Sequence, residues 1–119
     1  MIQFAQNQIR KNKLLKELKR ITRIIIKDYS PEKIILFGSL ASDQIHSLSD
    51  IDIAIVKSTK KRFIERLYEV SLLVKPKLGV HFLVYTPQEL ESMVQENRLF
   101  LTKEILGKGH VLYARKPLV

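Results

Sequence analysis

Residues 36–56 read LFGSLASDQIHSLSDIDIAIV, and the layout of this stretch decides the fold. One apolar segment ends in a small turn, a polar loop follows, and a second apolar segment contains Asp50 and Asp52 one residue apart. An isolated buried carboxylate usually finds a partner or shifts its pKa, and two neighbouring carboxylates also repel each other. The stretch therefore predicts a positively charged partner for the two aspartates.

The second apolar segment predicts a strand with both carboxylates on one face. Side chains alternate along a strand, so Asp50 and Asp52 point the same way and the isoleucines between and after them point the other way. Mg²⁺ commonly binds one or two carboxylates together with water and substrate phosphates. Because no arginine adjoins the pair in the sequence, a bound metal ion is the expected source of the missing charge.

The turn before the loop offers the second half of a site. Gly38 ends an apolar segment and lets another group approach the backbone, and Ser39 offers a hydroxyl and N–H groups to an anion. A triphosphate held there would complete the shell of a metal on the aspartates, an arrangement suited to phosphoryl-type transfer. Each piece also has a plainer interpretation, since Gly-Ser is commonly a simple turn and Asp-x-Asp is common in surface strands and Asx turns.

Outside this stretch the sequence predicts alternating strands and helices. Apolar runs at 33–37, 50–56 and 79–85 predict buried strands, with a last short strand at 110–114. Residues 38–42 form a turn that can open a short helix. Between the strands, Phe63, Leu67, Val70 and Leu73 recur at helical spacing. The order predicts an α+β fold, with one small mixed sheet packed with helices.

A further helix is expected after the third strand. Thr86 is placed to be its N-cap, Pro87 its first residue and Glu89 its third, as in a capping box. The helical pattern continues until Gly107.

The chain of 119 residues predicts one domain over 1–119, with an N-terminal amphipathic helix over 1–30 and a catalytic-type core over 33–113. The sequence contains no cysteine, which excludes disulfides and thiolate metal sites and fits a reducing cytosol. No apolar run approaches the ~20 residues that span a bilayer, and no secretory signal pattern opens the chain. A cytoplasmic location is expected, and the oligomeric state, a homo-oligomer included, stays open.

The net charge of +9 favours anionic partners such as nucleotides or nucleic acid. Much of the charge lies in RKNKLLKELKRITRIIIK, residues 10–27. Helical spacing there predicts an amphipathic helix whose basic residues form the solvated face. The apolar positions are Leu14, Leu18, Ile21 and Ile25.

The motif G-S, ten residues, then D-x-D, flanked by LF and IAIV, resembles the minimal nucleotidyltransferases of the DNA polymerase β-like superfamily. The resemblance runs from about Ile34 over nearly the whole remaining chain. It implies transfer of a nucleoside monophosphate from an NTP, typically ATP, to an acceptor hydroxyl. By position, Gly38 and Ser39 would hold the phosphates, and Asp50 and Asp52 would bind Mg²⁺.

The sequence departs from the family pattern in two places. His81 stands where the family often has a third carboxylate at the start of the third strand. An imidazole can act as a general base but is a poor Mg²⁺ ligand, and packing in the sheet is the plainer interpretation of this histidine. The turn reads GSLASD where members commonly read G-S-R-A-R-G, which removes two guanidinium groups and adds the charge of Asp43.

Two sets of residues bear on these departures and on partners. The lysines after the second strand, Lys57, Lys60 and Lys61, would compensate for the missing arginines or form exposed surface. The resemblance also implies a HEPN-type helical partner protein, as in toxin–antitoxin pairs, and Leu99, Phe100 and Leu101 are candidates for an interface or, more simply, for the core. The alternative to an enzyme is a weakened or inactive family member that binds protein or nucleic acid.

Overall fold

A computed structural model gives the structure of residues 2–115. No helix in this part of the chain is long and apolar enough to cross a membrane. Its elements, in chain order, are α1 (Ile2–Asp28), β1 (Lys33–Phe37), α2 (Gly38–Ser42), β2 (Ile51–Val56), α3 (Phe63–Val74), β3 (Val80–Tyr85), α4 (Pro87–Gln95), the π-helix η1 (Phe100–Gly107) and β4 (His110–Ala114).

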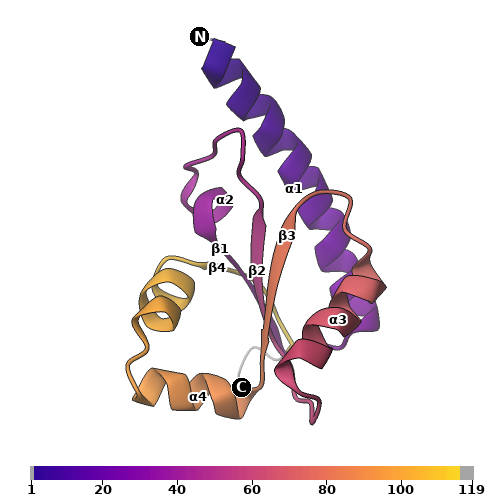
Figure 1. Cartoon of the computed structure of the whole chain (residues 1–119), viewed down its shortest axis with the longest axis vertical. Helices are drawn as coiled ribbons and strands as arrows, with labels where there is room; N and C mark the ends of the chain where they lie inside the picture. Colours follow the sequence, from indigo (N-terminus) through magenta and orange to yellow (C-terminus); the bar gives the residue numbers. More distant parts are fainter. Residues whose placement is uncertain (1, 116–119) are drawn as a thin grey trace.

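The four strands form one mixed sheet, as the sequence predicts, and their order in it is β3-β2-β1-β4 (Figure 1). The strand β1 is antiparallel to both β2 and β4, whereas β2 and β3 are parallel. In this register Asp52 lies between Phe37 of β1 and His81 of β3. The central position of β2 therefore brings its first residues beside the turn that follows β1.

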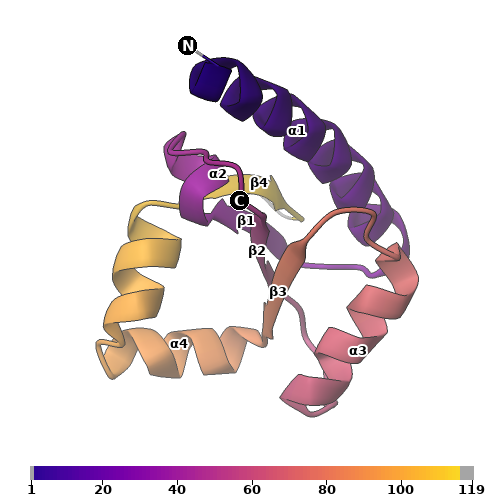
Figure 2. The ribbon, with the colours of Figure 1, turned by 45° about the horizontal axis from the view of Figure 1, so that its top comes forward.

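Helices cover both faces of the sheet (Figure 2). The isoleucines of β2 pack with α1 and α3 in the larger apolar cluster. On the opposite face, Phe37 and Ala54 pack with η1 and α4. Since residues two apart share a face of a strand, Asp52 lies on the face of Ala54, toward η1 and α4.

The helix α1 confirms the amphipathic pattern. Its predicted apolar residues are all buried, namely Leu14, Leu18, Ile21 and Ile25. At 1.5 Å per residue its 27 residues span about 40 Å, and its N-terminal end extends past the sheet (Figure 1). The N-terminal half therefore has a different environment from the half that packs in the core.

The helix α3 covers its predicted apolar positions but buries them less fully than their spacing predicts. Val70 is buried, but Phe63 is 38% exposed and lies with its ring centroid 5.9 Å from that of Tyr85. A charged residue takes a core position instead: Arg66 is 5% exposed, and its guanidinium donates to the Val84 carbonyl at 3.0 Å and to Glu89 at 2.7 Å. These bonds satisfy the buried charge and link α3, β3 and α4.

The start of α4 confirms the predicted cap, but its end corrects the prediction. Thr86 Oγ1 accepts from the Glu89 backbone at 3.1 Å, and Glu89 accepts in return from the Thr86 backbone at 2.9 Å. The helix then ends at Gln95, because a turn with Asn97 at φ 55° separates it from η1. A positive φ cannot continue a right-handed helix.

The segment 99–101 at the start of η1 is split between core and surface. Leu101 is buried at 3% exposure, as the simpler interpretation expects, whereas Leu99 and Phe100 are 68% and 51% exposed. Phe100 still makes an edge contact with Phe37, with ring centroids 6.0 Å apart.

Candidate functional site

The side chains of Asp50 and Asp52 converge at the start of β2. Asp50 directly precedes the strand and Asp52 is its second residue. His81 lies beside both carboxylates, with Nδ1 2.8 Å from Asp52 Oδ1 and Nε2 3.9 Å from Asp50 Oδ2. The structure thus brings together the three residues that the sequence singles out as catalytic candidates.

Two glycines make room for the two carboxylates. A Cβ atom at Gly38 would lie 2.1 Å from Asp52 Oδ2, and one at Gly79 would lie 2.3 Å from Asp50 Oδ1. Gly38 also has φ 78°, a backbone conformation that favours glycine. Each carboxylate therefore sits against bare backbone.

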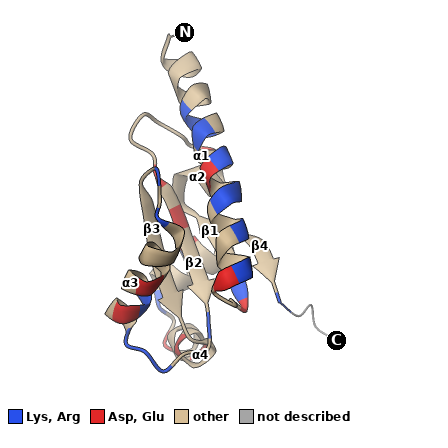
Figure 3. Ribbon diagram, turned by 90° about the vertical axis from the view of Figure 1, so that its right-hand side faces the viewer, with Lys and Arg blue, Asp and Glu red and all other residues tan. Residues whose placement is uncertain are grey.

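The positive charge near the aspartates comes partly from the protein itself. Arg10 of α1 donates to the Ser49 carbonyl from Nη2 at 2.8 Å and from Nε at 3.1 Å, and its Nη2 lies 3.4 Å from Asp50 Oδ1. The expected metal ion is therefore not the sole candidate for the positive charge, because an arginine 40 residues earlier in the chain reaches Asp50. Figure 3 shows the basic residues spaced along α1.

A serine pair joins the turn to the loop. Ser39 Oγ donates to Ser49 Oγ at 3.0 Å, and Ser49 Oγ also accepts from the His46 backbone at 2.9 Å. Ser49 is 2% exposed, so these bonds satisfy a buried hydroxyl. The hydroxyl expected to meet phosphate is thus already engaged inside the protein, whereas the His46 side chain is exposed.

A polar cavity of about 540 Å³ adjoins the turn. Lys108, which follows η1, contributes a positive charge to its wall and pairs with Glu104 at 3.2 Å. The lining residues are Gly38, Ser39, Ser42, Gln44, Glu104 and Lys108. Because Gly38 also contacts Asp52, the cavity and the carboxylates meet at one residue.

The negative charge of Asp43, which departs from the family pattern, is neutralised by a nearby lysine. Asp43 has φ 59°, in the region where glycine is favoured and where Asp is among the better tolerated alternatives. Lys11 of α1 lies 2.7 Å from its carboxylate. The extra charge expected beside a triphosphate is therefore paired with a lysine of α1.

Two of the three lysines after β2, Lys57 and Lys61, are engaged away from the carboxylates, and Lys60 is exposed. Lys57 lies five residues from Asp52, about 17 Å along an extended strand, and donates to the Tyr29 carbonyl. Lys61 pairs with Glu69 of α3. Lys57 thus lies at the opposite end of the strand from the carboxylates, and Lys61 is engaged with α3.

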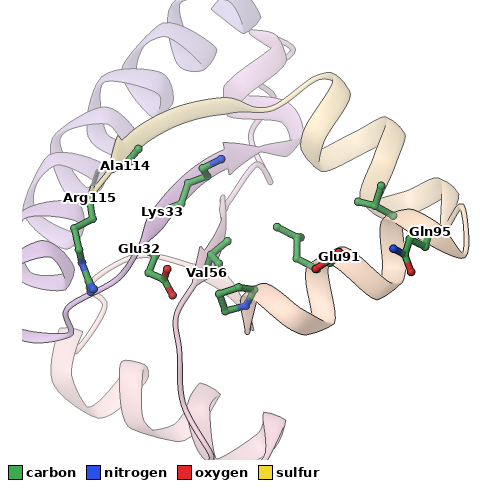
Figure 4. A pocket seen from close by; sticks show the side chains of 10 residues that line it. Glu32, Lys33, Val56, Glu91, Gln95, Ala114 and Arg115 are labelled. Carbon is green, nitrogen blue, oxygen red and sulfur yellow. The ribbon is translucent and has the colours of Figure 1, made fainter. Parts of the chain in front are cut away.

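A larger cavity, about 630 Å³, also lies at that opposite end (Figure 4). Lys33, Val56 and Ala114 line it, and they are the end residues of their strands farthest from the Gly38 turn. Its size alone does not make it the site, since neither aspartate lines it.

The donor set fits a hard divalent cation bound largely by non-protein ligands. No group of three or more His, Cys, Asp or Glu side chains within residues 2–115 is placed to hold a metal. Asp50 and Asp52 provide two carboxylates, which is the number that Mg²⁺ usually takes from a protein when phosphates and water fill the other positions. His81 adds a nitrogen donor that Mg²⁺ disfavours.

Several residues of this site are not predicted from the sequence. Arg10 carries no local signal, since its contact spans 39 residues. The sequence predicts Gly79 only as the first residue of the third strand, and Ser49 only as loop. Lys108 stands between Gly107 and Gly109, and a Cβ at Gly109 would lie 2.1 Å from the Ile105 carbonyl oxygen, so the GKG pattern was a usable sign of a constrained turn.

Comparison with known proteins identifies the family and the fold. The sequence model described as "Polymerase beta, Nucleotidyltransferase" matches residues 19–118. A protein from Sulfolobus solfataricus, provisionally assigned as a nucleotidyltransferase, shares the fold with a TM-score of 0.66 and 20% identity, over 94% of this chain and 90% of that one. No curated protein matches the sequence significantly. The chain belongs to the polymerase beta nucleotidyltransferase family.

Proposed function

We propose that the protein is a Mg²⁺-dependent nucleotidyltransferase that transfers a nucleoside monophosphate, AMP from ATP, to a hydroxyl acceptor. The acceptor oxygen bonds to the α-phosphorus as the bond to pyrophosphate breaks. One observation carries the proposal: Gly38 lines the polar cavity and at the same time makes room for Asp52. Nucleotide phosphates in that cavity would lie next to the carboxylate pair.

The residues of the chain divide the work of such a reaction. Gly38 and Ser39 would hold the phosphates, with Lys108 as the cation of the cavity wall. Asp50 and Asp52 would hold the metal, and family members generally use a divalent ion. When bound, that ion neutralises phosphate charge and makes the acceptor oxygen a better nucleophile. Most of the remaining contribution is positioning.

His81 is the residue we assign to the acceptor's proton. When the neutral ring carries its proton on Nδ1 and donates it to Asp52, 2.8 Å away, Nε2 is left as an acceptor. The side chain is 68% exposed, so a hydroxyl can approach it from solvent. This role makes His81 a general base.

Thermal unfolding with Mg-ATP tests the proposal. Ligand at 100 times its Kd adds about 2.7 kcal/mol of stability, so a rise in Tm is expected for the wild-type chain. Asp52→Asn should abolish most of the rise, while Asp28→Asn, an exposed aspartate at the end of α1, should keep it. The absence of a rise with millimolar Mg-ATP or any other NTP argues against the enzyme.

The acceptor is proposed to be a HEPN-type helical partner protein. What supports this is the family resemblance together with the small size of the chain. Incubating the protein with labelled ATP, Mg²⁺ and the product of the adjacent gene should label that product. Label on the chain itself, or on neither protein, counts against this acceptor.

Specific contacts also favour the second candidate, a weakened family member that acts as a binding module. Arg10 and His81 already pair with the carboxylates, and the Ser39 hydroxyl is engaged by Ser49. If the module binds nucleic acid, the exposed Lys16 of α1 should matter, and binding should fall steeply with salt. A gel shift that is absent at low salt removes the nucleic-acid version.

A further inference from the structure

The contacts of Arg10 differ from those of a simple ion pair. Its two hydrogen bonds, 2.8 and 3.1 Å long, converge on one backbone carbonyl, that of Ser49. The contact with Asp50 is longer, at 3.4 Å, and both of its side chains are partly exposed, at 24% and 32%. Because exposed ion pairs contribute little to stability, the pair of hydrogen bonds from Arg10 to the Ser49 carbonyl is the stronger interaction.

The carbonyl that Arg10 holds directly precedes Asp50. The peptide unit between Ser49 and Asp50 sets the direction in which the Asp50 side chain leaves the backbone. On its other side, Asp50 packs against Gly79, and Ile51 donates to the Gly79 carbonyl at 3.0 Å. The sheet holds this segment at Ile51, and Arg10 fixes its other end, at the Ser49 carbonyl.

A second contact ties the same part of α1 to the same loop. Lys11 lies 2.7 Å from Asp43, where the loop begins, and Arg10 holds Ser49, where it ends. The two basic residues thus bind the two ends of the loop that joins the Gly38 turn to β2. Both lie before residue 19, where the match to the family begins.

We infer that Arg10 is a positioning residue for the carboxylate pair, acting through the backbone carbonyl of Ser49. This inference rests on the proposed function, because it concerns how Asp50 is presented to a divalent ion. The N-terminal half of α1 is then part of the site, although the family match does not include it.

Two substitutions separate positioning from charge. Arg10→Met removes the hydrogen bonds and the charge, whereas Arg10→Lys keeps the charge but loses the planar fork that bonds one carbonyl through two nitrogens. If Arg10 acted only by charge, the methionine variant would bind cations more tightly and the lysine variant would match the wild type. If it acts by positioning, both variants bind divalent ions more weakly.

The experiment is a Mn²⁺ titration followed by electron paramagnetic resonance, without nucleotide. Both Arg10 variants should bind Mn²⁺ about tenfold more weakly, the equivalent of one net hydrogen bond. Lys13→Met is the charge-matched control, since Lys13 is exposed on the same helix, and it should bind like the wild type. Hydrogen exchange over residues 44–50 should be faster in the Arg10 variants only, with Tm nearly unchanged because the buried core of α1 begins at Leu14.

The possible results are distinct. Arg10→Lys binding Mn²⁺ like the wild type, or Arg10→Met binding it more tightly, overturns the inference while the proposed function stands. Failure of the wild-type chain to bind Mn²⁺ overturns the proposed function, and with it the inference. An equal loss in Lys13→Met would show that the effect is not specific to the contacts of Arg10 and would also overturn the positioning role.

Discussion

Replacing Gly79 with alanine should disable the site without unfolding the protein. The new Cβ would lie 2.3 Å from Asp50 Oδ1 and 2.6 Å from its Cγ. Ordinary carbon contacts are about 3.5–4.0 Å, so the carboxylate must move by about 1 Å. It is the end of a side chain, so it can swing away while the backbone stays in place.

The stability change follows from two small opposing contributions. A moved carboxylate loses its 3.4 Å contact with Arg10, a partly exposed pair that contributes at most about 1 kcal/mol. Gly79 is not among the residues with positive φ, so alanine recovers about 0.4–1 kcal/mol of chain entropy. Unfolding entropy is about 2.1 cal/mol/K per residue, so for 119 residues each 1 kcal/mol change in the free energy of unfolding shifts Tm by about 4 °C. The Tm of Gly79→Ala should therefore stay within about 4 °C of the wild-type value.

Function should respond far more strongly than stability. A displacement of 1 Å at a reacting centre can reduce the rate by about 100-fold, and Mn²⁺ affinity should fall with it. The assays are calorimetric Tm, Mn²⁺ titration and transfer from labelled ATP. Gly38→Ala is the contrasting variant, because its φ of 78° adds about 1 kcal/mol or more of backbone strain. Wild-type metal binding and transfer in Gly79→Ala would refute the packing argument, as would a loss of stability above about 3 kcal/mol.

Three further predictions concern the scaffold and His81. Arg66→Met should cost about 3 kcal/mol, since Arg66 is buried while Glu89 keeps part of its hydration, and a fall in Tm under about 4 °C would show that the buried contacts matter little. The hydrogen bond from Arg20 lowers the pKa of Glu17 from 4.5 to about 2, so this group stabilises the fold above pH 4.5 and loses its contribution as the pH falls toward 2. Glu17→Gln should therefore lower the free energy of unfolding by about 3 kcal/mol at pH 7. In urea unfolding near pH 2 the stabilities of the variant and the wild type should converge, and a constant difference between them across that pH range contradicts the linkage. His81→Asp should raise Mg²⁺-dependent transfer, because the new carboxylate can accept the acceptor's proton in place of the imidazole and is also a better Mg²⁺ ligand; an unchanged rate would assign His81 a structural role.

The predictable parts of the fold are those that local sequence determines. The strands and the start of α4 follow from alternation of apolar residues and from the side-chain chemistry of Thr86 and Glu89, which act within a few residues. The break before η1 was missed because nothing in the composition of the segment marks Asn97 as a residue of positive φ. Arg66 was missed because its partners on β3 and α4 are not visible from the helix pattern alone.

The residues of the candidate site likewise divide into those that local sequence predicts and those that it does not. Gly38, Asp50, Asp52 and His81 could be identified because a spaced motif and strand alternation place them, and the structure brings them together. Arg10 could not, because its contact depends on how a long helix crosses the sheet, which no local rule determines.

The course of α1 also bears on how the domain should be delimited for expression. A fragment starting at residue 19, where family similarity begins, would retain the glycine-serine turn and both aspartates. It would lack Arg10 and Lys11, and it would remove Leu14 and Leu18 from the core. Such a fragment would keep the glycine-serine turn and the Asp-x-Asp motif and yet be a poor substitute for the whole chain, because the region of family similarity is shorter than the folded unit in this molecule.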